Sequence, residues 1–280
     1  MIEAQLFSLR EFSDMAGIDR GVLRDGVRLV CRDWGGSGIP VVLLHGLAGH
    51  IGEWDHLAEK LSPRYRVVAV DQRGHGRSER HPPEVTRAAF VEDIVAVADQ
   101  LELERPVVVG QSMGGHAAML VAAAHPDLVR ALVMIEAGPG IAGSDAPSKI
   151  GAWLDSWPTP FPNREAAVEY FGGGALGRGW ADGLEERDGK WWPRFERDVM
   201  AAVIAEIADR SYWPEWAGIG CPVLVVLAQS SFISAPDVDR MLRDRPETVA
   251  VSVPGTGHDL HLQQPDSLHA AISDFLAPLV

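Results

Sequence analysis

One serine in this chain of 280 residues has neighbours that suit nucleophilic catalysis. The sequence G-Q-S-M-G at 110–114, centred on Ser112, follows the apolar run 106–109 and precedes a stretch of small residues at 113–125. A sharp turn from a buried strand into a helix would hold the serine hydroxyl exposed at the helix N-terminus, where only small residues fit beside it. The pattern predicts a nucleophilic serine, and the alternative is a glycine-rich turn without chemistry.

A second motif offers hydrogen-bond donors for the same reaction. The sequence L-L-H-G-L-A-G at 43–49 lies at the exit of an expected strand, where a backbone amide could face the serine. Negative charge that develops on a carbonyl oxygen needs fixed donors. The backbone N–H groups of Leu47 and Met113 are the natural pair, so we expect them to form an oxyanion hole. The alternative for His45 and Gly46 is a tight turn only.

A third motif, D-Q-R-G-H-G-R-S at 71–78, follows the next apolar run. With these three motifs in this order, the chain from about residue 22 to residue 280 resembles the α/β-hydrolase superfamily. The resemblance implies a catalytic triad of serine, acid and histidine, an oxyanion hole, and hydrolysis of acyl compounds. It implies an architectural role for Asp71 and Arg73, which are therefore left out of the predicted catalytic set.

The base of the triad is expected after the last strand. The sequence P-G-T-G-H-D at 254–259 resembles the G-x-G-H segment of the superfamily, which makes His258 the predicted base. An imidazole with a pKa near 6.5 can take the serine proton and return it to a leaving group near neutral pH. The pair His258 and His261 lacks the further ligands of a metal site, and no metal or cofactor is expected. His116, one helical turn after the serine, is predicted to pack within its helix.

The acid departs from the commonest pattern of the superfamily, which places an aspartate a few residues after the strand corresponding to 222–228. Ser231 occupies that position here, and a serine supplies no negative charge for an imidazolium. Glu136 ends the strand after the nucleophile helix, where a minority of the superfamily carries the acid, so Glu136 is the predicted acid. The alternatives are a capping role for Glu136 and an acid at Asp237, which resembles a helix-start residue.

The motifs lie on strands and helices that alternate along the chain. Short apolar runs predict strands at 27–34, 40–46, 65–74, 106–112, 131–136, 222–228 and 248–255. Helical spacing of apolar residues predicts helices at 87–103, 113–125, 236–245 and 265–275. Repeated strand-helix-strand units predict an α/β fold with a mostly parallel, twisted sheet flanked by helices. The first two strands are expected to be able to pair as a hairpin.

Regular alternation fails between residues 139 and 218, which are rich in Gly, Pro and Trp. The sequence predicts one α/β-hydrolase core from 1–138 and 219–280, with 139–218 inserted as a helical lid. Seven of the nine tryptophans lie in this insertion, so an apolar entrance for a bulky substrate is expected. Candidate substrate-binding residues are His50, Trp153, Trp157 and Trp192. The alternative for any one ring is packing inside the insertion, and for His50 a solvent-exposed position.

The composition of 46% hydrophobic and 23% charged residues is that of a globular protein. A net charge of −14 repels phosphate backbones and anionic lipids, so neither nucleic acid nor a membrane is an expected partner. The first thirty residues lack the apolar run of a signal peptide. Cys31 and Cys221 suit reduced thiols within strands. We therefore expect a cytoplasmic monomer or homodimer.

Together these features predict a serine hydrolase that cleaves a carboxylic ester or lactone with a bulky apolar or aromatic acyl substrate, through an acyl-enzyme. Two alternatives stay open. The same triad supports hydrolysis of a carbon-carbon bond in a β-diketone type of substrate in members of the superfamily. A chain with Ser231 in place of the usual aspartate could also be a non-enzymatic ligand receptor of the same fold.

Overall fold

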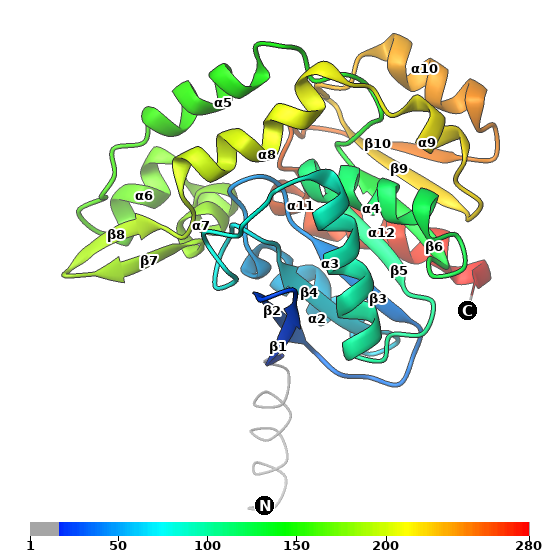
Figure 1. The fold of residues 1–280 in the computed structure, drawn as a ribbon, viewed down its shortest axis with the longest axis horizontal. Helices are drawn as coiled ribbons and strands as arrows, with labels where there is room; N and C mark the ends of the chain where they lie inside the picture. The colour runs from blue at the N-terminus through cyan, green and yellow to red at the C-terminus, as the bar shows by residue number, and fades with distance from the viewer. Residues whose placement is uncertain (1–16, 280) are drawn as a thin grey trace, which may run out of the picture.

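The computed structural model describes residues 17–279 and is built around an eight-stranded sheet (Figure 1). Its strands are β1 (Ile18–Arg24), β2 (Val27–Asp33), β3 (Pro40–Leu44), β4 (Arg66–Asp71), β5 (Val107–Gln111), β6 (Ala131–Ile135), β9 (Val223–Ala228) and β10 (Val249–Val253). Their order across the sheet is β1-β2-β4-β3-β5-β6-β9-β10, and neighbours from β4 to β10 are parallel. The prediction of a mostly parallel sheet is therefore confirmed, with β1 and β2 as an antiparallel edge.

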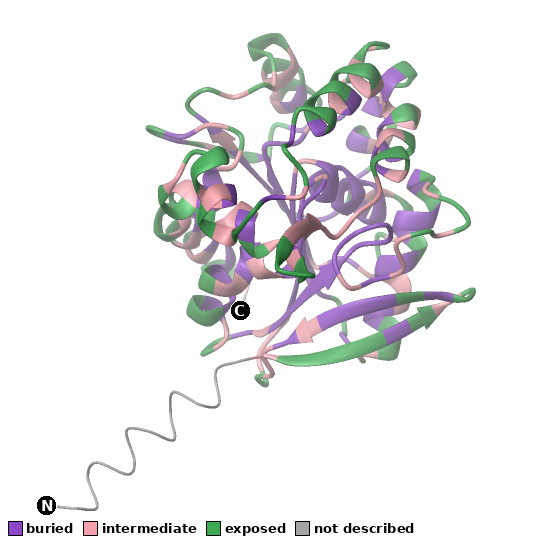
Figure 2. Ribbon diagram, turned by 90° about the vertical axis from the view of Figure 1, so that its left-hand side faces the viewer, coloured by how far each residue is buried: buried purple, intermediate pink, exposed green. Residues whose placement is uncertain are grey.

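Helices cover both faces of this sheet. One apolar core contains side chains of α3 (Arg87–Gln100), α4 (Met113–Ala124) and α9 (Trp213–Ala217), and a second core contains those of α2 (Asp55–Leu61) and α12 (Pro265–Leu276). The strands β5 and β6 are buried along their whole length, which explains why they consist almost entirely of apolar residues. Figure 2 shows the buried strands inside a shell of helices whose outer faces are exposed.

Four short elements outside 139–218 complete the core. They are η1 (Ile51–Trp54), α10 (Ala235–Asp244), α11 (Leu260–Gln263) and η2 (Ala277–Leu279). The first of these, η1, follows the loop after β3 and contacts α7 and α11. This contact brings the loop after β3 close to the loop after β10.

The expected hairpin between 27–34 and 40–46 is wrong. β2 pairs with β1 and with β4, while β3 lies between β4 and β5. The true hairpin joins β1 to β2 through Asp25 and Gly26, which have φ values of 48° and 82°. The dipeptide Asp-Gly favours a two-residue hairpin turn in which both residues have positive φ. The sequence therefore contained the signal for this hairpin.

Residues 139–218 form most of the structure between β6 and β9. They contain α5 (Ala146–Asp155), α6 (Arg164–Tyr170), α7 (Gly174–Asp182), β7 (Leu184–Arg187), β8 (Lys190–Pro193), α8 (Arg197–Asp209) and α9. Side chains from α5 to α8 share an apolar cluster that is separate from the two cores of the sheet. By contrast, Trp213 and Trp216 of α9 are buried in the core against α4. Two of the seven tryptophans in this segment therefore pack in the core of the sheet and do not line an entrance to the site.

Both cysteines are buried and free, with Cys31 in β2 and Cys221 two residues before β9. Burial raises the pKa of the Cys31 thiol to about 12, so this thiol stays protonated. Across residues 17–279, none of the helices has the length and apolar character needed to cross a membrane.

Candidate active site

Ser112 lies at the turn between β5 and α4. Its backbone has φ 51° and ψ −116°, a conformation that residues with a β-carbon rarely adopt. Gly110 and Gly114 make the turn possible. A β-carbon on Gly110 would lie 2.2 Å from the carbonyl oxygen of Gly114, and one on Gly114 would lie 2.3 Å from that of Leu44. The two glycines of the motif therefore allow the backbone to hold Ser112 at the helix N-terminus.

His258 follows β10 and Glu136 follows β6, and their side chains meet at the carboxyl ends of these strands. His258 Nδ1 lies 3.5 Å from Glu136 Oε2, and the Glu136 side chain is fully buried. Burial alone would raise the pKa of Glu136, but hydrogen bonds from His258, the Ala228 N–H and Ser231 outweigh it and lower the pKa. Glu136 is therefore ionised at neutral pH and can stabilise an imidazolium.

The backbone fixes Glu136 as firmly as it fixes the serine. Glu136 has φ 48°, and its Oε1 accepts a hydrogen bond of 2.7 Å from the N–H of Ala228 at the end of β9. The runner-up acid, Asp237, lies in the first turn of α10, where its carboxylate accepts a hydrogen bond of 2.8 Å from Ser234 Oγ. The structure thus brings Glu136 to His258 and gives Asp237 a different hydrogen-bond partner.

The loop after β3 is anchored by a buried histidine. His45 Nδ1 lies 2.7 Å from the carbonyl oxygen of Gly46, and its Nε2 accepts a hydrogen bond of 3.0 Å from the N–H of Gln72. Burial lowers the pKa of His45 to about 3, so the ring is neutral, with Nδ1 donating and Nε2 accepting. The next residues, Leu47 and Ala48, continue the turn, and Ala48 has φ 61°. This loop lies beside the serine, because a β-carbon on Gly46 would be 3.4 Å from the Ser112 β-carbon.

The DxRGxGxS motif at 71–78 forms hydrogen bonds with the backbone of loops near the site. Asp71 Oδ1 accepts a hydrogen bond of 2.8 Å from the Ile51 N–H, and Asp71 Oδ2 accepts one of 2.9 Å from the Arg77 N–H. Arg73 donates two hydrogen bonds to the carboxylate of Asp93, at 2.6 and 2.7 Å. All these contacts are within the protein, in keeping with the architectural role that the resemblance implies.

Gln111 is a residue that the sequence analysis missed. Its Nε2 lies 3.3 Å from His258 Nε2 and donates a hydrogen bond of 3.1 Å to the carbonyl oxygen of His258. The amide therefore ties the histidine loop to the strand that carries the serine. The variable position of G-x-S-x-G gives no sign of this contact, because the two residues are 147 positions apart.

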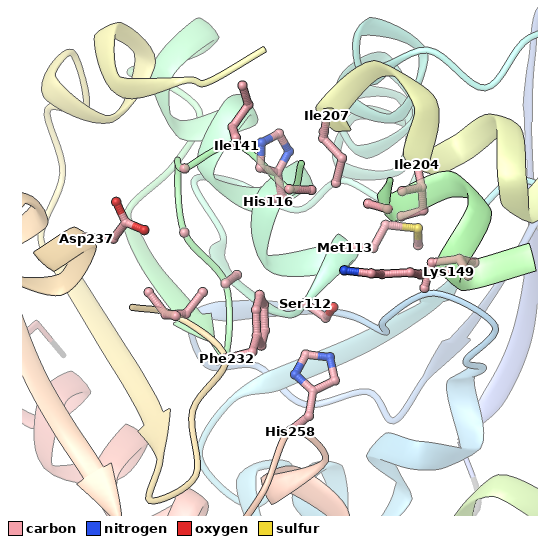
Figure 3. A pocket seen from close by; sticks show the side chains of 17 residues that line it. Ser112, Met113, His116, Ile141, Lys149, Ile204, Ile207, Phe232, Asp237 and His258 are labelled. Carbon is pink, nitrogen blue, oxygen red and sulfur yellow. The ribbon is translucent and has the colours of Figure 1, made fainter. Parts of the chain in front are cut away.

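The larger of two cavities beside Ser112 has a volume of about 520 Å³. Figure 3 shows Ser112 and His258 on one side of it, with Phe232 beside them and His116, Ile141 and Ile207 on the opposite side. The other isoleucines of its lining are Ile150, Ile204 and Ile233. The polar side chains Lys149 and Asp237 also line it, and Lys149 pairs with Asp145 at 2.7 Å. The lining is mainly apolar, as expected, but its large apolar side chains are mostly isoleucines instead of the predicted tryptophans.

The smaller cavity has a volume of about 250 Å³ and lies on the other side of the same serine. Ser112, His258, Ile150 and Ile204 line both cavities. The smaller one is further lined by Gly46, Leu47, Glu53, Gln111, Trp153, Trp180 and Asp259. Its lining is mainly apolar, like that of the larger cavity, but it adds the carboxyl groups of Glu53 and Asp259 and the amide of Gln111.

The four predicted substrate-binding residues occupy different environments. Trp153 lines the smaller cavity. Trp157 is buried among other rings of 139–218, with four ring centroids 4.7–5.9 Å away. Trp192 lies on β8 against Arg187, and His50 bonds Gly179 O and the Gly52 N–H. The structure places none of these last three on the wall of either cavity.

His116 lies in α4 as expected, but it also lines the larger cavity. Its ring packs edge-on against Tyr212, with centroids 4.5 Å apart. Burial lowers the pKa of His116 to about 3, so this imidazole is neutral at pH 7. It therefore adds no charge to the wall that it forms with the isoleucines.

The described residues 17–279 hold no group of three or more His, Cys, Asp or Glu side chains that could bind a metal ion. His258 and His261, the pair that could have suggested a metal site, contact different carboxyl groups. His258 faces Glu136, whereas His261 Nε2 lies 3.2 Å from Glu53 Oε2.

Comparison with known proteins agrees with this geometry. The family model described as "Alpha/beta hydrolase family" matches residues 41–271, and the chain belongs to this family. It is 28% identical over 249 residues to 2-(acetamidomethylene)succinate hydrolase of Mesorhizobium japonicum, covering 86% of this chain and 89% of that protein. It is 27% identical over 254 residues to Esterase YbfF of Escherichia coli, covering 85% and 92% of the two chains.

Solved structures extend the likeness to nearly the whole chain. The crystal structure of E-2-(acetamidomethylene)succinate hydrolase matches with a TM-score of 0.85 and 28% identity, covering 93% of this chain and 99% of that chain. The enol-lactonase of Burkholderia xenovorans LB400 shares the fold, with a TM-score of 0.76, 20% identity, and 92% and 100% of the two chains covered. Family and relatives support hydrolase activity, and the diversity of their names leaves the substrate to be inferred from the site.

Proposed function

We propose that this protein is a serine hydrolase that cleaves a carboxylic ester or lactone through an acyl-enzyme on Ser112. In this proposal His258 is the general base and then the general acid, and Glu136 orients and charges it. The backbone amides of Leu47 and Met113 form the oxyanion hole. The order of nucleophile, acid and base along the chain is that of α/β-hydrolases, and a relative of similar length carries the name esterase.

The observation that carries the proposal is the position of Ser112 at the junction of two cavities. Ser112 and His258 line both of them, and Glu136 lies 3.5 Å from His258 Nδ1. A substrate whose scissile bond lies at this junction would place one group in each cavity. Such an arrangement supports cleavage of a two-part substrate more than the storage of a single ligand.

In the first half-reaction, Ser112 Oγ attacks the carbonyl carbon while His258 Nε2 takes the hydroxyl proton. The carbonyl oxygen becomes an oxyanion, which accepts hydrogen bonds from the N–H groups of Leu47 and Met113. The ionised Glu136 stabilises the imidazolium of His258. When the tetrahedral intermediate collapses, His258 gives its proton to the leaving alkoxide, and the acyl group stays on Ser112.

In the second half-reaction, His258 Nε2 takes a proton from a water molecule that attacks the acyl carbon. The same two amides hold the new oxyanion. Collapse of this intermediate breaks the bond between the acyl carbon and Ser112 Oγ, and the proton on His258 returns to the serine. The products are the carboxylic acid and the alcohol, or one hydroxy acid when the substrate is a lactone.

The larger cavity supports an apolar acyl group as the preferred substrate part. Its isoleucines and Phe232 offer no hydrogen bonds, and each methylene buried there gains about 0.8 kcal/mol. Ile150, Ile204 and Ile207 come from α5 and α8. We therefore also propose that residues 139–218 act as the lid of the site and set its preference for the acyl group.

The receptor alternative rested on a missing acid at Ser231. The buried, ionised carboxylate of Glu136 next to His258 supplies that charge from another strand, which supports an enzyme. A β-diketone hydrolase would use the same three side chains. Only turnover of substrates of each kind therefore distinguishes cleavage of a carbon-oxygen bond from cleavage of a carbon-carbon bond.

The test is covalent labelling of Ser112 by a fluorophosphonate, together with turnover of p-nitrophenyl octanoate, a macrocyclic lactone and a β-diketone. We expect labelling, and hydrolysis of the octanoate or the lactone, in the wild-type protein, and neither in Ser112→Ala. Removal of a serine nucleophile lowers kcat by up to about 10⁶-fold. Wild-type protein that stays unlabelled at pH 8 would overturn the proposal, and turnover of the β-diketone alone would assign the second bond type.

A further inference from the structure

The two cavities beside Ser112 differ in the polar groups that line them. Isoleucine side chains dominate the larger one, whereas the smaller one places the side chains of Glu53, Gln111 and Asp259 around the serine. Burying a polar group without a hydrogen-bond partner costs on the order of 1–3 kcal/mol. Apolar side chains line the smaller cavity as well, but its carboxyl and amide groups would give a polar substrate group hydrogen-bond partners next to the serine.

Glu53 is the most deeply buried carboxyl group of this cavity, with 3% of its side chain exposed. It lies in η1, and its Oε2 is 3.2 Å from His261 Nε2. The carboxyl group also packs against the loop after β3, because a β-carbon on Gly49 would lie 2.7 Å from Oε1. None of the catalytic steps proposed above uses Glu53, although it lines the same cavity as Ser112.

The protonation of Glu53 follows from its surroundings. The pKa of Glu53 is raised to about 8, mainly by burial and also by Asp259 and Asp71, against the opposing effects of the His50 side chain and of a hydrogen bond from the His50 backbone. Burial lowers the pKa of His261 to about 4. At pH 7 both groups are therefore neutral, and Glu53 Oε2 and His261 Nε2 share a hydrogen bond of 3.2 Å. The other carboxyl oxygen, Oε1, then belongs to a neutral carboxyl group that can form a hydrogen bond with a hydroxyl group.

The position of His258 Nε2 bears on which side of the serine the leaving group occupies. Its Nε2, which returns the proton to the leaving group, is 3.3 Å from Gln111 Nε2. Gln111 lines the smaller cavity and is absent from the lining of the larger one. His258 lines both cavities, and this contact places its Nε2 beside a residue of the smaller one, which is the side that the scheme below gives to the leaving group.

We propose that the smaller cavity binds a leaving alcohol that carries a second hydroxyl group, and that the carboxyl group of Glu53 recognises this hydroxyl. The substrates would then be esters of an apolar acid with a short diol or triol, which fits a volume of about 250 Å³. Glu53 is a specificity-determining residue in this scheme. The inference rests on the proposed function, because it needs cleavage at Ser112.

The experiment compares two octanoate esters whose alcohols have the same number of non-hydrogen atoms, 2-hydroxyethyl octanoate and propyl octanoate. We expect kcat/KM of the wild-type protein to favour the hydroxyethyl ester by about 10-fold, the value of one hydrogen bond to a buried group. Glu53→Leu should lower this ratio to about one. Glu53→Gln should keep most of it, because the amide retains a carbonyl oxygen in the same shape.

A matched control is Glu59→Leu, which removes a carboxylate from the exposed side of α2 and should keep the wild-type ratio. Equal rates for the two esters in the wild-type protein would overturn the inference, even if Glu53→Leu fails to fold. A ratio that survives in Glu53→Leu would also overturn it. So would a preference for hexyl 3-hydroxypropanoate over hexyl butanoate, which puts the hydroxyl on the acyl side. Failure of the proposed function itself has a different signature, which is the absence of Ser112 labelling and of all ester hydrolysis.

Discussion

The carboxyl ends of the central strands and residues 139–218 contribute to the same cavities in different ways. At the strand ends, three neighbouring strands are each followed by a non-glycine residue with φ between 48° and 61°, namely Ala48, Ser112 and Glu136. Residues in this region cost of order 1–3 kcal/mol each unless the surrounding structure holds them. The sheet therefore fixes the proposed catalytic groups through the backbone, whereas helices of residues 139–218 contribute side chains to the cavity walls.

This comparison suggests that the reaction depends on the strand ends and the substrate preference on the segment. Substitutions at the strand ends should change kcat for every ester alike. Substitutions on α5 and α8 should change the ratio between esters.

Glu136→Gln should lower kcat by as much as about 10⁴-fold for all esters, with a smaller effect on KM. The amide keeps an oxygen for the Ala228 N–H but loses the charge that stabilises the imidazolium of His258. Steady-state kinetics with p-nitrophenyl acetate and octanoate measure the effect. Asp237→Asn is the matched control, because it also removes one carboxylate charge beside the larger cavity. If Asp237→Asn abolishes turnover and Glu136→Gln keeps it, the acid is misassigned.

The second prediction concerns the histidines, all ten of which lie outside 139–218. Burial lowers the pKa values of His45, His75 and His116 to about 3 and that of His261 to about 4. Between these values and about 6.5, the unfolded chain binds more protons than the folded one, so the free energy of unfolding should fall as the pH falls. The residues outside 139–218 should therefore determine how low the pH can fall before the protein unfolds.

Urea unfolding of His116→Phe at pH 8 and pH 5 measures this effect. Removing one such histidine should recover about 2 kcal/mol of the stability that the wild-type protein loses between the two pH values. His81→Phe, at an exposed histidine, is the control. The same loss of stability in wild-type protein and His116→Phe would show that His116 does not contribute to the pH dependence.

The strand ends are the part of the molecule that could be predicted from sequence. Parallel strands between helices are short apolar runs, and the residues that follow them must gather at one edge of the sheet. Ser112 and His258 stood out because a strained turn and a strand exit restrict which residues fit. Ser231, where an aspartate is expected, directed attention to Glu136, and the structure places the carboxylate of Glu136 3.5 Å from His258 Nδ1. The side-chain contact of Gln111 with His258 did not follow, since no local rule links residues so far apart.

The cavity walls were the part that could not be predicted. The sequence shows that tryptophans are abundant in 139–218, but it does not show whether a ring faces the cavity, a neighbouring ring or the sheet. Trp157 packs among rings and Trp216 packs on α4. The isoleucines that line the larger cavity carry a weak signal, because Ile204 and Ile207 are three residues apart on α8 and so share a face. Which face of α8 meets the cavity depends on tertiary packing.

The third prediction uses those isoleucines. Ile207→Ala combined with Ile233→Ala should lower kcat/KM for p-nitrophenyl octanoate by about 10-fold and leave the acetate ester nearly unchanged. Both side chains line the larger cavity but not the smaller one, so only a long acyl chain would lose contacts with them. Ile18→Ala, at an exposed position of β1, is the control. Equal losses for both esters would show that the larger cavity does not hold the acyl group.

The smallest effect is expected for Trp192→Ala. Its ring packs against the guanidinium of Arg187, with 5.7 Å from the Cζ atom to the ring centroid, on a hairpin away from both cavities. Exposed contacts of this kind contribute about 0.5–1 kcal/mol to stability, so a slightly lower Tm is expected and kcat/KM should change by less than about 2-fold. Trp153→Ala removes a ring from the wall of the smaller cavity and should change kcat/KM more. A loss of activity in Trp192→Ala as large as that in Trp153→Ala would mean that β8 moves onto the substrate during the reaction. Residues 139–218 would then take part in the reaction, and the division of roles between the strand ends and this segment would fail.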